Sequence, residues 1–188
     1  MSPDSYHHGN LKAELIEKGL EFIANYGTEN LSLRKLADSV GVSPAAPYAH
    51  FRKKEAFVSE VRDYITDQFY TILKDASDHC TDPSRILMDL GKSYVFFFYK
   101  NPLYYRFLFS IDSIDIENYP PFVLFKSTVE NVLKRKYGQE TEDGFIHAKV
   151  IALWSMVHGL STIVTIKGVV NKNRLDEEVE RILVSINI

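Results

Sequence analysis

The chain has 188 residues, of which 45% are hydrophobic and 25% charged, with only 9 Gly and 7 Pro. This composition is typical of a folded globular protein and excludes disordered, collagen-like and low-complexity sequence. The single cysteine, Cys80, excludes an internal disulfide and a thiolate metal cluster. The polar opening lacks a signal-peptide pattern, and no stretch approaches the roughly 18 to 20 apolar residues that span a bilayer. We therefore expect a cytoplasmic protein without a membrane partner.

The charge is unevenly distributed along the chain. The whole chain carries −3, but the stretch from Arg34 to Lys54 has five positive side chains and one negative one, a net +4, which leaves −7 for the remainder. Such a basic stretch on an acidic body is what the neutralisation of phosphate requires, although a solvated surface explains the same charges. Charge alone favours the solvated surface, so the choice between a phosphate-binding stretch and a solvated one depends on the sequence motifs.

Apolar residues recur at helical spacing along nearly the whole chain, and no run alternates in the manner of a β-strand. The pattern predicts an all-α protein of about nine helices. A change of composition near Lys53 divides the chain into an N-terminal unit, residues 1–53, and a larger unit, residues 54–188, joined by a long helix. The predicted helices are 10–26, 33–40, a short helix capped by Ser43, 53–79, 82–100, 102–110, 120–137, 143–167 and 175–187.

The second and third predicted helices have the pattern of a helix-turn-helix. Gly41 allows the positive φ that the turn needs, Ala37 is small where the two helices approach, and Phe51 is apolar where the unit must bury itself. Pro47 lies inside the third helix, where it removes a hydrogen bond to the Ser43 carbonyl. We therefore expect a tightened or irregular third helix that is still present.

The residues of the helix-turn-helix that its core does not need are suited to contacting DNA. The third helix offers small side chains and polar donors to a major groove, and Lys53 and Lys54 stand at the following corner, where phosphates would lie. Two positive charges at a helix N-terminus oppose the helix macrodipole, and a phosphate partner explains their presence. Ser32, just before the second helix, can cap it.

These features closely resemble the tetracycline-repressor (TetR) family of bacterial transcriptional regulators. The resemblance is strongest between Leu11 and Val61, and a weaker one links the C-terminal Trp…His-Gly motif and the opening residues to one subfamily. The segments that carry it are Leu33-Arg34-Lys35-Leu36-Ala37, Gly41-Val42-Ser43, Tyr48-Ala49-His50-Phe51-Arg52-Lys53-Lys54-Glu55, Trp154-Ser155-Met156-Val157-His158-Gly159-Leu160 and Tyr6-His7-His8-Gly9-Asn10-Leu11.

The resemblance implies a homodimer that reads a palindromic DNA operator and holds a small-molecule inducer in its C-terminal body. By matching position, Tyr48, His50 and Lys54 would contact phosphate, while Ser32 and Arg34 would touch DNA beside the second helix. The complete set of candidate DNA-binding residues is Ser32, Arg34, Ser43, Pro44, Ala45, Ala46, Tyr48, His50, Lys53 and Lys54.

The C-terminal part is rich in aromatic residues. Each of them taken alone is better explained as core, but several together predict an apolar ligand cavity. Trp154 and His158 are four residues apart and share a helix face, which fits a pocket wall and a hydrogen-bonded core histidine equally well. The candidate ligand-binding residues are Phe97, Phe98, Phe125, Trp154 and His158.

The last two helices are the predicted dimer interface, as two such pairs would form a four-helix bundle. Small residues recur on the first of these helices, where they would let helices approach closely and would also suit packing within the subunit, and an apolar stripe runs along the second. The two sets are Ala152, Ser155, Gly159 and Thr162, and Leu175, Val179, Ile182, Leu183 and Ile186.

Catalytic signatures are missing from the sequence. It contains no nucleophile paired with a base, no Gly-rich phosphate loop and no spaced metal ligands. We therefore expect no enzymatic activity, no cofactor and no metal. The expected function is a DNA-binding regulator, a repressor released from its operator by a small molecule. The alternative is a helical protein that binds a ligand or a partner and keeps the helix-turn-helix only as structure.

Overall fold

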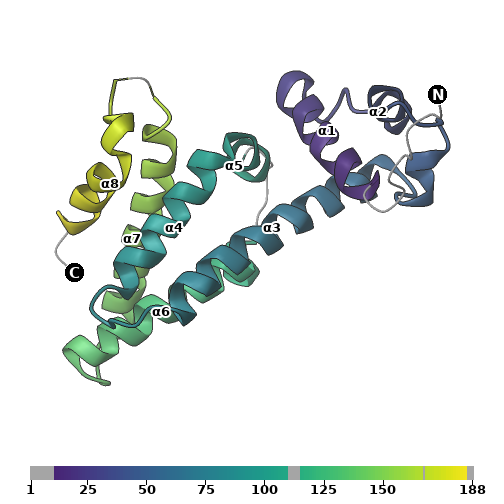
Figure 1. Cartoon of the computed structure of the whole chain (residues 1–188). Helices are drawn as coiled ribbons and strands as arrows, with labels where there is room; N and C mark the ends of the chain where they lie inside the picture. The colour runs from purple at the N-terminus through teal and green to yellow at the C-terminus, as the bar shows by residue number, and fades with distance from the viewer. Residues whose placement is uncertain (1–10, 110–114, 167, 186–188) are drawn as a thin grey trace. The chain divides into compact units, whose positions relative to one another are not determined.

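The computed structural model describes residues 11–109, 115–166 and 168–185. Within these ranges the fold is all-α, as predicted, with eight α-helices, three short 3₁₀ helices and no strand (Figure 1). The elements are α1 (Leu11–Tyr26), α2 (Leu33–Val40), η1 (Ala46–Ala49), α3 (Lys54–Asp78), α4 (Ile86–Lys100), α5 (Pro102–Phe109), η2 (Ile116–Asn118), α6 (Pro120–Tyr137), α7 (Asp143–Ile163), η3 (Lys172–Arg174) and α8 (Leu175–Val184).

Eight of the nine predicted helices are α-helices, and the third is the 3₁₀ helix η1. The largest error in a helix start is at Asp82, which was predicted to begin a helix that in fact begins at Ile86. A carboxylate oxygen of Asp82 accepts hydrogen bonds from the backbone N–H of Ser84 at 2.9 Å and from its hydroxyl at 2.7 Å, and this local turn takes the place of a cap. The predicted helix ends at Lys167 and Asn187 lie outside the described residues.

Contacts divide the chain into two units. The first comprises residues 1–65 with 103–112, and the second comprises residues 66–102 with 113–188. Helix α3 thus contributes its first half to one unit and its second half to the other, while α5 supplies residues to the first unit. In the described part of the chain no helix is both long enough and apolar enough to cross a bilayer.

The core of the first unit lies under α1 and α2. The rings of Phe51 and Phe57 meet edge to face with their centroids 4.9 Å apart, and both side chains are fully buried. Gly19 of α1 lies so close to Phe57 that an added Cβ would stand 2.2 Å from Cζ of the ring. Helix α1 also accepts a hydrogen bond at the carbonyl of Ala24 from the guanidinium of Arg106 in α5, at 3.2 Å.

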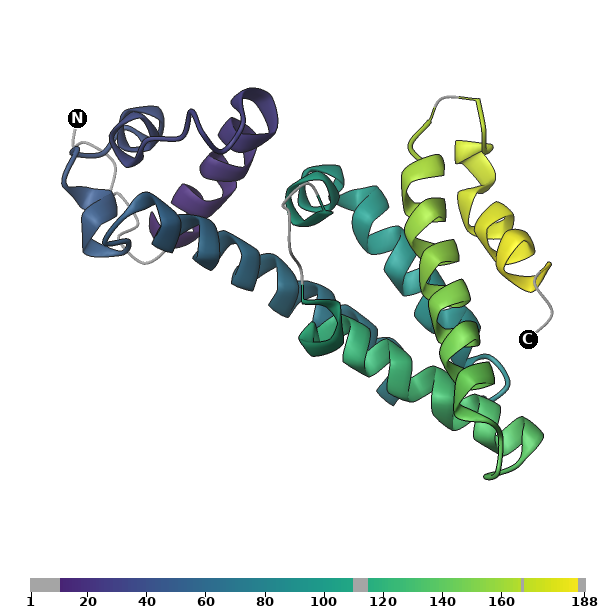
Figure 2. The same cartoon turned by 180° about the vertical axis from the view of Figure 1, so that it is seen from behind.

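The second unit is built around α4, which packs against α6, α7 and α8, while α6 packs against α7 (Figures 1 and 2). Aromatic rings fill its core. The indole of Trp154 lies 5.0 Å from the rings of Tyr94 and Phe122 and 5.2 Å from that of Phe125, each nearly perpendicular to it. Edge-to-face contacts of this kind add to the stabilisation that burial alone provides.

Candidate nucleic-acid interface

The turn between α2 and η1 has the geometry of a helix-turn-helix. Gly41 has a φ of 75°, and the N–H groups of Gly41 and Val42 donate to the carbonyls of Asp38 and Ala37 at 3.3 and 3.0 Å. These bonds satisfy the last carbonyls of α2 and stop the helix. Gly41 has open space where a Cβ would stand, so the positive φ is the reason for glycine at this position.

The expectation that the Ser32 side chain caps α2 is wrong. Ser32 occupies the N-cap position with an extended backbone, and its carbonyl accepts the Leu36 N–H at 2.9 Å, but its hydroxyl makes no capping hydrogen bond. Because the first turn of α2 does not use that hydroxyl, it stays available to a partner outside the chain.

The segment that follows the turn is a tight helix, as the position of Pro47 predicts. The Ala46 N–H donates to the Ser43 carbonyl at 2.9 Å, and the Tyr48 N–H donates to the Ala45 carbonyl at 3.1 Å. These are 3₁₀ bonds between residues three apart. Proline has no N–H with which to make the α-helical bond to Ser43, so the carbonyl of Ser43 takes the closer donor. Pro47 itself is buried.

This short helix has one buried and one exposed side. Pro47 and Phe51 face the core, whereas Tyr48 keeps 53% of its surface exposed. The side chains on the exposed side are small or polar, so the protein backbone can approach the edges of bases. Of the predicted residues here, Ala46 is half-buried, and the exposed ones are Ser43, Pro44, Ala45, Tyr48 and His50.

Positive side chains border this surface. Arg34 and Lys53 are exposed, and neither makes an ion pair with another described residue. Lys54 is half-buried, and its ammonium donates to the carbonyl of Glu29 at 3.4 Å, a long bond that leaves further N–H donors for a phosphate. Lys35 and Arg52, which the candidate set omits although they belong to the basic stretch, are exposed as well.

The predicted ligand-binding residues lie within the second unit. Phe98, Phe125 and Trp154 are buried, and the imidazole of His158 is hydrogen-bonded through Nδ1 to the Tyr94 hydroxyl at 3.0 Å. Burial lowers the pKa of His158. His158 is half-buried, and its hydrogen bond is compatible with both interpretations of the sequence, a pocket wall and a hydrogen-bonded core histidine.

Two cavities of the second unit are each lined by one of the predicted ligand-binding residues. A groove of about 830 Å³ between α3 and α4 is lined by Phe97, and a pocket of about 400 Å³ is lined by Phe125. Phe98, Trp154 and His158 line neither of these two cavities. The five predicted residues are therefore not collected around either of them.

Comparisons with known proteins agree with this geometry. Residues 15–61 match the family model of bacterial regulatory proteins of the tetR family. A tetR-family regulatory protein from Rhodococcus RHA1 shares 16% identity over 94% of this chain and 96% of its own, with a TM-score of 0.70. A TetR-family transcriptional regulator from Bordetella parapertussis shares 13% identity over 96% of this chain and 100% of its own, with a TM-score of 0.70.

A third solved structure, the TetR-family transcriptional regulator PfmR from Thermus thermophilus, shares 20% identity over 93% of this chain and 99% of its own, with a TM-score of 0.65. No curated protein matches this chain significantly. Residues 15–61 are therefore a tetR-family N-terminal domain, and the fold of the whole chain is that of TetR-family transcriptional regulators.

Proposed function

We infer that this chain, with its tetR-family N-terminal domain and the fold of tetR-family regulators, is a DNA-binding transcriptional regulator. The observation that carries the inference is the exposure of Tyr48 and His50 at η1 together with the exposed cations Arg34 and Lys53, which make no ion pair with another described residue. Positive side chains and hydroxyl donors around a short exposed helix fit a major groove and the phosphates on either side of it. A helix-turn-helix kept only as structure would need none of these groups.

The DNA test measures fluorescence anisotropy of labelled fragments from the region upstream of the protein's own gene, at several salt concentrations. Lys53→Ala should weaken binding and lower the salt slope by about one unit, because one phosphate contact is lost. Lys172→Ala is the matched control, since Lys172 is an exposed lysine of η3 in the second unit. Equal slopes for both variants would contradict the assignment, and absence of binding to any fragment would favour the purely structural helix-turn-helix.

We further propose that the chain is a homodimer through α7 and α8. Helix α7 buries one face within the subunit and leaves a second face of small and apolar residues exposed, including Ala152, Ser155, Thr162 and Ile163, the last with 43% of its surface exposed. Small residues on an exposed helix face allow another helix to approach closely. No atom lies within 4 Å of the position that a Cβ of Gly159 would take, which adds to the space along this face.

The apolar stripe of α8 is used differently from the prediction. Leu175, Val179 and Leu183 are buried inside the subunit, and Leu183 lies 3.2 Å from where a Cβ of Gly91 in α4 would stand. These three apolar side chains of α8 pack it against α4. Ile186 lies outside the described residues. The contribution of α8 to a dimer must therefore come from its exposed side, where Val184 is 60% exposed.

The dimer is tested by light scattering after gel filtration. Ser155→Arg places a large charged side chain on the exposed face of α7 and should yield a monomer, whereas Asn131→Arg on the exposed surface of α6 should stay a dimer. A dimeric Ser155→Arg variant would exclude this face, and a monomeric wild-type protein at micromolar concentration would exclude the dimer altogether.

The regulator is proposed to act as a repressor that a small molecule releases from a palindromic operator. Helix α3 supports this mechanism, because it is one continuous helix that begins beside the DNA-binding surface at Lys54 and lines a groove of the second unit at Thr71 and Ile72. A ligand that favours one position of α3 changes DNA affinity, and the DNA changes ligand affinity by the same factor. We also propose, from the Trp154…His158-Gly159 motif of the sequence, that the chain belongs to the subfamily that shares it.

A further inference from the structure

The largest cavity described above is the groove of about 830 Å³ between α3 and α4, within the range of small-molecule sites. Its floor is apolar. Phe97 stacks on Phe69 with the ring centroids 5.1 Å apart and the planes 23° apart, and Ile72 and Phe96 complete the apolar lining. Phe97 keeps only 7% of its surface exposed, so the apolar surface open to a ligand comes mainly from Ile72, 41% exposed, and the half-buried Phe96, with the edge of Phe97 between α3 and α4.

Four of the polar side chains that line the groove have partners within the chain. The Thr71 hydroxyl donates to the carbonyl of Asp67 at 2.8 Å, and the Asn101 amide donates to the carbonyl of Phe97 at 2.8 Å. Lys92 forms ion pairs with Asp176 at 2.7 Å and with Glu180 at 3.0 Å, and these pairs join α4 to α8 at one end of the groove. These side chains form the wall of the site, and their hydrogen-bonding capacity is largely used.

Gln68 differs from these side chains because its unpartnered polar atom is buried. It lines the groove, and its amide nitrogen is buried with no hydrogen-bond partner in the described part of the chain. A buried N–H that lacks an acceptor is destabilising, so such a group in a ligand-sized groove indicates a place for an acceptor from outside. The acceptor that suits an amide N–H and an apolar floor is a carbonyl oxygen.

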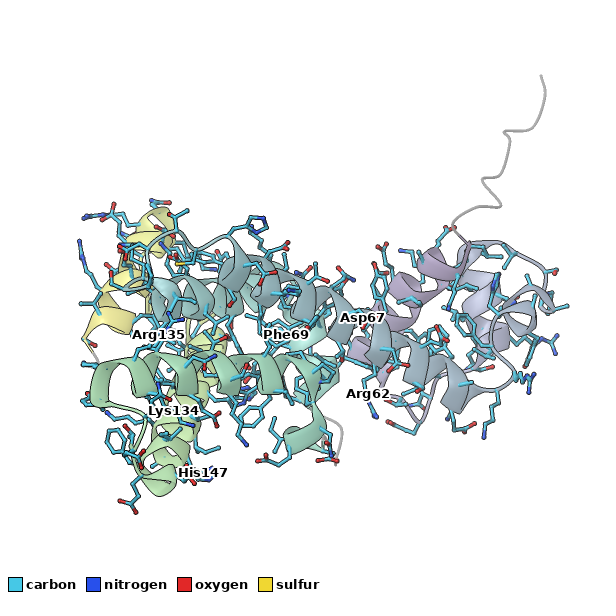
Figure 3. All side chains as sticks on the ribbon, turned by 90° about the horizontal axis from the view of Figure 1, so that it is seen from below. Arg62, Asp67, Phe69, Lys134, Arg135 and His147 are labelled. Atoms are coloured by element: carbon cyan, nitrogen blue, oxygen red, sulfur yellow. The ribbon has the colours of Figure 1, made fainter. Side chains whose placement is uncertain are left out.

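The charges of the lining determine what net charge the ligand carries. Asp67 and Asp176 balance Lys92 and Lys100, so the groove has no excess of either sign. Asp67, which is exposed on α3 beside Gln68 and labelled in Figure 3, opposes a carboxylate at that end, while Lys100 opposes an ammonium group. A neutral ligand avoids both penalties.

We propose that this groove binds a neutral aromatic molecule through a carbonyl oxygen that accepts from Gln68, with the aromatic body on Phe96 and Phe97. The proposal rests on the ligand-responsive function proposed above and names the chemical class of the effector. It also moves the effector site away from Trp154 and His158, which line the core beside Tyr94, to the open side of α4.

The experiment uses four probes with one naphthalene body: 2-acetylnaphthalene, 2-ethylnaphthalene, 2-naphthoate and 2-naphthylmethylammonium. Binding to the full chain is measured by ligand-observed NMR titration without DNA. The acetyl compound should bind about tenfold more tightly than the ethyl compound, which lacks the acceptor, and more tightly than either charged compound. Failure of the acetyl compound to bind at millimolar concentration, or tighter binding of a charged probe, would overturn the proposal.

Gln68→Leu separates a binding role from a structural one. Removing an unpartnered buried amide should leave the fold as stable as before or more stable, yet it should weaken the acetyl probe about tenfold and leave the ethyl probe unchanged. Met88→Ala, in the smaller cavity, is the matched control and should leave both affinities unchanged. If Met88→Ala weakened the binding of both probes equally, the probes would lie in the smaller cavity, and the assignment to the groove would be refuted.

Failure here is distinguishable from failure of the proposed function. Anisotropy with operator DNA reports the regulator, and probe binding without DNA reports the groove. A chain that binds DNA but prefers no carbonyl probe refutes only the groove assignment. A chain that binds the probe through Gln68 but no DNA refutes only the regulator.

Discussion

The hydroxyl of Tyr94 on α4 and Nδ1 of His158 on α7 are 3.0 Å apart and joined by a hydrogen bond. The bond links two of the most closely packed helices of the second unit, and Tyr94 is fully buried. A buried phenol that satisfies a half-buried imidazole stabilises the contact between the two helices. Burial of the imidazole disfavours its protonated form, so the stability of the protein should depend on pH.

We expect the free energy of unfolding to fall as the pH drops below the ordinary His pKa of 6.5. Burial lowers the pKa of His158, so between that lowered pKa and 6.5 the unfolded chain binds a proton that the folded chain does not. The loss should begin near pH 6.5 and level off below the lowered pKa. Urea unfolding at pH 7.5, 6.0 and 5.0 measures it.

His158→Gln provides the control, because glutamine keeps a polar side chain and does not titrate. The variant should lose less stability than the wild type between pH 7.5 and 5.0, although it starts lower by about 1 kcal/mol for the altered hydrogen bond. Identical pH dependence of the two proteins would show that another histidine carries the effect.

Gly19→Ala should destabilise the protein by about 1 to 3 kcal/mol, despite the better helix propensity of alanine. The added Cβ would stand 2.2 Å from Cζ of Phe57, so α1 or the ring must move. Gly144→Ala is the control, because there the nearest atom is the end of the Glu142 side chain at 3.3 Å. Phe57→Leu should rescue part of the Gly19→Ala loss in a double variant. If the losses of stability in the two single variants simply add in the double variant, the strain does not arise from the contact between position 19 and Phe57.

The local features of this fold were readable from single residues. Gly41 was predicted to end α2 with a positive φ, and Pro47 was predicted to tighten the next helix, because backbone geometry follows directly from these two residue types. Phe51 was identified as core because it is apolar where the helix-turn-helix must bury itself, and it is buried. Such features depend on neighbours along the chain, which the sequence displays.

Features that depend on distant residues were not readable. Asp82 is a separate, local case: it has the residue type of a helix cap, yet it bonds to Ser84 and stabilises a turn, because the same side chain suits both structures. The groove needs Gln68 and Phe97 from different helices, and its distinguishing property is a missing partner, which no spacing reveals. The stripe of α8 that includes Val179 was assigned to a dimer, although α4 covers it within the subunit. A helical period predicts a buried face but not which surface buries it.

Tyr48→Phe should weaken operator binding about 2- to 10-fold and change the free energy of unfolding by less than about 0.5 kcal/mol. Tyr48 is 53% exposed, so its hydroxyl contributes little to the fold, while a phosphate would accept its hydrogen bond. Tyr137→Phe on α6, 51% exposed, should change neither quantity. Anisotropy and urea titrations measure the two effects. Unaltered DNA affinity in Tyr48→Phe would remove this hydroxyl from the interface.

Pro47→Ala should change which bases are preferred more than how strongly phosphates are bound. Alanine restores an N–H at position 47, which can donate to the Ser43 carbonyl that now accepts from Ala46 at 2.9 Å. The segment then relaxes from a 3₁₀ to an α-helical turn. This change moves Ala45 and Ala46 relative to the major groove of the DNA. The stability cost should be about 1 kcal/mol, because the unfolded chain gains freedom.

Two measurements check this last expectation. Carbon chemical shifts of residues 44–49 should move toward α-helical values, and affinities for operators with single base-pair changes should be reordered at the positions nearest η1. The salt slope should stay the same, because Arg34 and Lys53 lie outside the altered turn. Pro102→Ala, at the exposed first position of α5, controls for the loss of a proline elsewhere. An unchanged order of operators together with shifted carbon resonances would show that η1 does not read bases.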